Sequence, residues 1–116
     1  MPPKPLNTFQ AFALEQLNRA QPTTAKRMFG GVGLYHAGRF FALMDDDALW
    51  LKVDDTNRGD FEARGMQPFY PFGDDGPVMH YWQLPEDVLE DIDELRRWCD
   101  KAIAVAAAAK KPKRRS

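Results

Sequence analysis

A glycine-rich segment is the first candidate for a chemical role, that of a phosphate-binding loop. Gly30, Gly31 and Gly33 lie close together in it, beside large apolar residues. A glycine-rich loop binds phosphate when a helix N-terminus follows it, since backbone N–H groups then point at the anion. Here the following residues resemble a strand, and the lysine and hydroxyl residue of a Walker motif are missing. The helix of a dinucleotide fingerprint is missing too. The segment indicates a chain reversal or bulge under Phe29.

A binding role for the same segment stays open. Its backbone N–H groups and the two cations that precede it could contact an acidic protein partner. We therefore take as candidate partner-binding residues Lys26, Arg27, Phe29, Gly30 and Gly31.

Histidine and serine are too sparse to form a familiar catalytic set. His36 and His80 fall on different expected strands, and neither has a neighbour at metal-ligand spacing. The only serine is the last residue, Ser116, so no serine triad can be placed.

Aspartates cluster at 45–47, 54–55 and 74–75, in expected turns where carboxylates are solvated. Acid–base catalysis needs a pocket that separates the pKa values of two such groups. We expect no catalytic residue, no metal site and no cofactor, and therefore no enzyme. An enzyme or ligand-binding domain would require a concave pocket, and the surroundings of His80 and Tyr81 are the place to look for one.

The single cysteine, Cys99, cannot form an internal disulfide. Arg96, Arg97 and Lys101 could lower its pKa, but Asp100 opposes them. Its place in a helical pattern favours a small, half-buried apolar role over a reactive thiol.

Length and composition indicate one domain: the chain has 116 residues, of which 44% are hydrophobic and 28% charged. No apolar run approaches the roughly 20 residues of a membrane helix. Residues 1–6 are proline-rich, are expected to be flexible and lack the apolar stretch of a signal peptide. We expect a cytoplasmic protein with no membrane contact.

Charge is unevenly distributed along the chain. The formal net charge is −1, and five positive charges lie in residues 110–116, so the remainder carries −6. An acidic body is a poor surface for nucleic acid, whereas a basic disordered tail can bind it weakly. The candidate nucleic-acid residues are Lys110, Lys111, Lys113, Arg114 and Arg115.

Residues 7–109 are the expected folded domain, and their sequence patterns predict a succession of helices and strands. A first helix begins at Asn7 or Thr8 and ends before Pro22; its apolar side is expected to hold Phe9, Phe12, Ala13, Leu17 and Ala20. Three strands follow, at 31–36, 39–44 and 48–53. The two-residue linker Ala37-Gly38 suits a tight hairpin turn.

The second half of the domain contains a short helix, two strands and a long helix. The short helix has candidate N-caps at 54–56, runs to Arg64 and is ended by Gly65. The strands span 68–72 and 78–82, and the long helix runs from Pro85 to about Ala109. One apolar stripe follows the long helix, which indicates a helix lying on a sheet and leaves open a homodimer seam. The candidate dimer residues are Val88, Ile92, Leu95 and Cys99.

Short turns between strands predict an antiparallel sheet with helices on one face, in a two-layer α+β fold. The predicted element order is α-β-β-β-α-β-β-α.

An ordered set of short segments resembles the N-terminal domain of TfoX (Sxy), the bacterial competence regulators. The resemblance extends from Thr24 to Ala107 and rests on 27–35, 41–43, 49–54, 61–65, 68–69, 79–86 and 93–98. It implies a fold like that of type III secretion chaperones, in the element order given above.

The same resemblance implies a transcription-linked role without catalytic activity, because TfoX-type regulators promote competence genes together with the cyclic-AMP receptor protein. Full regulators have a second, helical domain, and this chain resembles a stand-alone N-terminal domain. We expect a regulatory or adaptor protein that works through protein–protein contacts, with weak nucleic-acid binding by the tail as the alternative.

Overall fold

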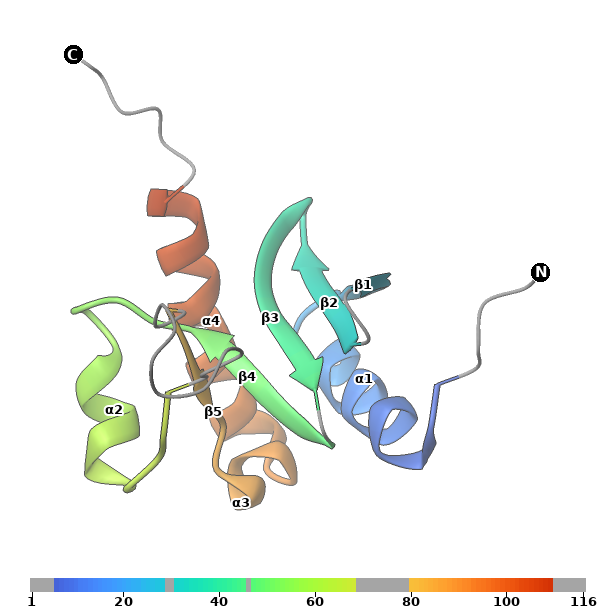
Figure 1. Cartoon of the computed structure of the whole chain (residues 1–116), viewed down its shortest axis with the longest axis horizontal. Helices are drawn as coiled ribbons and strands as arrows, with labels where there is room; N and C mark the ends of the chain where they lie inside the picture. Colours follow the sequence, from blue (N-terminus) through green and yellow to red (C-terminus); the bar gives the residue numbers. More distant parts are fainter. Residues whose placement is uncertain (1–5, 29–30, 46, 69–79, 110–116) are drawn as a thin grey trace, which may run out of the picture.

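The structure is a computed structural model that describes residues 6–28, 31–45, 47–68 and 80–109. In these ranges the chain is an α+β domain (Figure 1), which confirms the predicted fold class. Its elements are α1 (Thr8–Ala20), β1 (Thr24–Met28), β2 (Gly31–His36), β3 (Arg39–Asp45), β4 (Ala48–Lys52), α2 (Arg58–Ala63), β5 (Tyr81–Gln83), α3 (Glu86–Leu89) and α4 (Ile92–Ala109). None of the helices so described is long and apolar enough to cross a membrane.

Helix α1 begins at a capping box. The Asn7 side chain accepts a hydrogen bond from the N–H of Gln10, and the Gln10 side chain accepts one from the N–H of Asn7. The buried face holds Ala13, Leu17 and Ala20. The prediction was wrong for Phe12, which is 41% exposed, because its position lies far around the helix from Leu17.

The strands form one antiparallel sheet in the order β1-β2-β3-β4-β5. The β2–β3 turn confirms the predicted hairpin: Ala37 and Gly38 have φ values of 51° and 80°, as a two-residue primed turn requires. Strand β2 keeps the predicted bounds. Its pairing with β3 shifts register between Leu34 and Tyr35, which is a β-bulge.

Strand β1 is absent from the sequence-based prediction. Thr24, Ala25, Lys26 and Arg27 are all exposed, because β1 lies at the edge of the sheet and contributes little to the core. An edge strand of this kind has no apolar alternation for a pattern to detect.

The core lies between the sheet and the two longest helices. Helix α4 packs across β3 and β4, and α1 packs against α4 (Figure 1). Arg96 on α4 joins the two helices, because its guanidinium donates to the carbonyls of Ala20 and Arg19 at 3.0 and 3.2 Å. A cation placed there also complements the negative end of the α1 dipole.

The predicted long C-terminal helix is two helices. Helix α3 ends at Leu89, and α4 begins at Ile92. Asp91 starts the second helix, since its carboxylate accepts from the N–H of Glu94 at 3.2 Å, as an N-cap does. The interruption turns the chain after Leu89, so Val88 belongs to a different helix from Leu95 and Cys99.

The predicted strand pair at 68–72 and 78–82 is described only in part. Pro68 forms an isolated antiparallel bridge with Trp82, and Tyr81 begins β5. Residues 69–79 lie outside the described residues.

Candidate functional site

Two surfaces are candidates for function, and the first contains the glycine-rich segment. Gly31 begins strand β2, which confirms that a strand and no phosphate-binding helix follows. A Cβ on Gly31 would lie 2.5 Å from the carbonyl oxygen of Met44, so glycine is required here by the close approach of β3. Phe29 and Gly30 lie outside the described residues.

Lys26 and Arg27 lie on β1, on opposite faces of the sheet edge. Lys26 pairs with Gly33 and Arg27 with Val32, and successive strand residues point to opposite faces. In the described part of the chain β1 pairs with β2 alone, so its other side presents backbone donors and acceptors. We call residues 24–27 the β1 edge.

The candidate dimer seam is mostly core. Val88, Leu95 and Cys99 are at most 1% exposed and belong to the hydrophobic cluster of the single chain. Ile92 is partly buried against that cluster. These side chains already pack against the chain's own core, so this stripe does not form an exposed seam. The tail candidates at 110–116 lie outside the described residues.

Cys99 is fully buried, as an apolar core residue is. Burial, together with the negative charge of the neighbouring Asp100, raises the pKa of its thiol to about 12. The thiolate is the reactive form of cysteine, so this environment suppresses reactivity.

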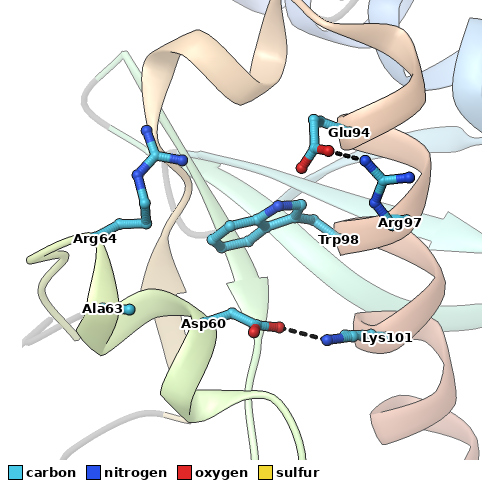
Figure 2. Close-up of a pocket in the computed structure, with 7 residues that line it drawn as sticks. All are labelled: Asp60, Ala63, Arg64, Glu94, Arg97, Trp98 and Lys101. Carbon is cyan, nitrogen blue, oxygen red and sulfur yellow. Dashed lines mark hydrogen bonds and ion pairs between the residues drawn. The ribbon is translucent and has the colours of Figure 1, made fainter.

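The second surface is a cleft of about 300 Å³ between α2 and α4 (Figure 2). We call it the α2–α4 cleft. It is lined by Asp60, Ala63, Arg64, Glu94, Arg97, Trp98 and Lys101.

The turn that precedes α2 is fastened to the end of β4 by Asn57. This side chain is 2% exposed; its oxygen accepts from the N–H of Asp54 at 2.9 Å, and its amide donates to the carbonyl of Lys52 at 3.1 Å. The predicted caps at 54–56 therefore act within the turn, before the helix begins at Arg58. The pKa of Asp54 is lowered because the hydroxyl and N–H of Thr56 donate to its carboxylate.

Phe61 anchors α2 in the core and supports the floor of the cleft. It is 1% exposed, and its ring meets Trp98 in a T-shaped contact with 4.8 Å between centroids. The indole of Trp98 projects from α4 towards α2 and is half-buried (Figure 2). The contact fixes one side of the indole and leaves part of it facing the cleft.

Ion pairs flank this indole. The Glu94–Arg97 pair lies on one side and the Asp60–Lys101 pair on the other, the latter with 2.7 Å between Lys101 Nζ and Asp60 Oδ2 (Figure 2). Arg64, at the end of α2, pairs with Asp87 of α3 at 2.5 Å. All three cations are exposed, so each remains accessible to a ligand.

The cleft was missed in the sequence. Glu94, Trp98 and Lys101 follow helical spacing on one face of α4, next to the buried stripe of Leu95, Cys99 and Ala102. That spacing was a usable signal. Nothing in either helix, however, indicated that α2 would form the opposite wall.

The lining consists of cations, carboxylates, an indole and a methyl group, a set that can bind a ligand through both polar and apolar contacts. Among the described residues no group of three or more metal-ligating side chains is found. His80 and Tyr81, the sequence-based location for a pocket, do not line the cleft, and Tyr81 is 4% exposed.

In a comparison with known families, the model of the TfoX N-terminal domain matches residues 15–106, which include every described strand, the end of α1 from Glu15 and most of α4. No curated protein matches the chain.

Proposed function

We propose a regulatory, non-catalytic function for this chain, which belongs to the TfoX N-terminal domain family. It acts as an adaptor in transcription or competence regulation, in the cytoplasm, by contacting another protein. The family relationship supports the regulatory part of this proposal, and the β1 edge supports the part that concerns a partner.

The β1 edge is the observation that carries the proposal. A partner segment can extend a sheet by pairing with an edge strand, since the outer backbone groups of that strand supply hydrogen bonds. Lys26 and Arg27 extend above and below the edge, and both are exposed. An extended acidic segment would therefore find backbone partners in its plane and a cation on each face.

The same cations disfavour pairing of this edge with a second copy of the chain. Charged side chains on an edge strand, lysine above all, oppose its pairing with an identical strand. Two copies of this edge would bring like charges together, whereas an acidic partner would place its carboxylates near the exposed ammonium group of Lys26. The edge thus favours a different protein over a second copy of this chain.

Nucleic-acid binding through residues 110–116 is the second candidate. It is supported by the five cations of that segment, against a body of formal charge −6. Binding of this kind would be weak and would decline steeply with salt, because it depends on counterion release.

Capture followed by titration tests the adaptor function. The full chain is used to capture proteins from a bacterial extract, and each captured protein is then purified and titrated against three forms. These forms are the wild type, Lys26→Gln/Arg27→Gln, and Arg19→Gln/Arg58→Gln, which removes two charges elsewhere. A partner of the β1 edge should bind the edge variant at least about tenfold more weakly, or about 1.4 kcal/mol, and the control normally.

Duplex DNA supplies the opposing outcome. Fluorescence anisotropy at low and physiological salt compares the wild type with a full chain whose five tail cations are replaced by glutamine. Binding that survives this replacement would mean that the folded domain reads DNA directly, and the adaptor function would be wrong. Binding lost with the tail cations would assign the second candidate to the tail alone.

A further inference from the structure

The α2–α4 cleft is separated from the β1 edge by the width of the sheet. Helix α2 follows β4 and lies towards the β5 end, whereas β1 forms the other edge (Figure 1). Whatever occupies the cleft is therefore a different contact from the one proposed above.

Charge identifies the kind of occupant. The lining holds three cations, Arg64, Arg97 and Lys101, and each has one carboxylate partner (Asp87, Glu94 and Asp60), so positive and negative charges balance at the cleft, whereas the body as a whole carries −6. The cleft therefore repels an acidic ligand less than the acidic body does, and its exposed guanidinium and ammonium groups can donate to that ligand. Such local contrast gives specificity more than affinity.

The ion pairs of the cleft can rearrange at little cost. Both partners in each pair are more than a third exposed, and exposed pairs contribute only about 0–1 kcal/mol each. A carboxylate of a ligand can therefore join or replace Glu94 beside Arg97, or Asp60 beside Lys101. Arginine also offers two parallel donors to an incoming carboxylate.

Trp98 identifies the second property of the occupant. Its indole lies as an apolar surface between the two ion pairs (Figure 2), and the ring of Phe61 packs against it in the T-shaped contact. Tryptophan and arginine are the residues most often found at binding hot spots. A volume of about 300 Å³ accommodates one large apolar side chain, with acidic groups on either side of it.

We propose that the α2–α4 cleft binds an acidic peptide segment of a partner protein, with one aromatic or aliphatic side chain seated on Trp98 and flanking carboxylates paired to Arg97 and Lys101. A nucleic acid fits less well. Its phosphate backbone would extend over the acidic body beyond the cleft, where the charge is unfavourable.

Model peptides test the proposal without knowledge of the partner. The probe is an acetylated, amidated pentapeptide with two glutamates on each side of a central phenylalanine, titrated into the full chain with detection by two-dimensional NMR. Two matched peptides replace phenylalanine by alanine, or all glutamates by glutamine. Saturable shifts at the backbone N–H groups of α2 and α4 are expected with the first peptide, and both replacements should weaken binding at least threefold.

Three variants separate the cleft from other surfaces. Arg97→Gln/Lys101→Gln should weaken peptide binding about tenfold, equivalent to about 1.4 kcal/mol. Arg19→Gln/Arg58→Gln, with the same charge change, should bind as the wild type does. Lys26→Gln/Arg27→Gln should also bind normally, so the cleft and the β1 edge can fail independently.

A fourth variant checks whether the domain stays folded when the cleft is altered. Trp98→Phe keeps an aromatic ring against Phe61, and its circular dichroism and thermal midpoint report whether the domain stays folded. Equal binding by the charge variant and the wild type would overturn the proposal. So would the absence of shifts at millimolar peptide, or saturable binding of oligothymidylate at the cleft in place of the peptide.

Discussion

Phe61 and Trp98 meet at an interplanar angle of 84°, and through this contact the short helix α2 is joined to α4. Phe61 is the one residue of α2 that is buried, while Trp98 stands at the surface end of the pair. The contact therefore links the core to the cleft. A helix of six residues has little stability of its own, so its place depends on this anchor.

Phe61→Ala should destabilise the domain by about 3–5 kcal/mol, because it removes a buried aromatic ring and leaves a cavity. Urea denaturation followed by circular dichroism measures this change. Phe12→Ala is the matched control, since Phe12 is 41% exposed and its loss should cost much less. Equal effects of the two substitutions would show that Phe61 is not the anchor of α2.

Gly31→Ala should destabilise the domain by about 1–3 kcal/mol, because the added methyl group would overlap the carbonyl of Met44 and force β2 from β3. Gly59→Ala provides the contrast: apart from its chain neighbours and the backbone of its own helix, nothing lies within 4 Å of its Cβ position, and alanine favours a helix by up to about 1 kcal/mol. Thermal unfolding should thus shift in opposite directions. A neutral Gly31→Ala would mean that the strands separate easily at this point.

The sequence predicted the elements that have their own local signals. Strand β2 kept its bounds and the Ala37-Gly38 turn has the expected positive φ values, because alternation and turn chemistry are both local. Gly65 likewise has φ of 70° just beyond α2, as expected for a residue that ends a helix.

The missed features depend on contacts between distant segments. Residues 24–27 of edge strand β1 are all exposed, so they carried no periodic signal. The break before α4 occurs at Asp91 without glycine or proline. The cleft requires α2 and α4 to meet through Phe61 and Trp98, which are far apart in sequence. Periodicity shows that each has an apolar side, but does not show which sides meet.

Asn57→Ala should destabilise the domain by about 1–3 kcal/mol, because it leaves the part-buried N–H of Asp54 and carbonyl of Lys52 without their partner. The measurement is the urea midpoint of the variant. Thr56→Val is a useful control, since Thr56 is exposed and its hydroxyl contacts only the carboxylate of Asp54 among the bonds described. A larger loss of stability from Thr56→Val would show that the hydrogen bonds of Asp54, and not those of Asn57, chiefly hold the turn in place.

Cys99 should react with a thiol reagent only when the domain opens. Its side chain is buried, and burial raises the pKa of the thiol to about 12, so little thiolate forms at pH 8. In Ellman's assay the native chain should react slowly and the urea-unfolded chain at once. Rapid reaction of the folded chain, with its circular dichroism unchanged, would contradict the buried position of the thiol.

Stability should decline at alkaline pH, and Cys99 should account for part of the decline. The pKa of its thiol rises from 9.0 to about 12 on folding, so between these values the unfolded chain has lost a proton that the native chain keeps. Free energy of unfolding then falls with pH, by at most about 1.4 kcal/mol per pH unit for one proton. Burial raises the pKa of Tyr81 from 10.0 to about 12 and acts in the same direction. Lys52 opposes both. Burial lowers the pKa of its ammonium group, so as pH rises the native chain loses this proton before the unfolded chain does, and the free energy of unfolding rises.

Urea titrations of wild type and Cys99→Ala between pH 7 and 10.5 isolate the contribution of the thiol. The variant should lose stability less steeply above pH 9. Parallel curves for the two proteins would show that Cys99 does not contribute to the decline.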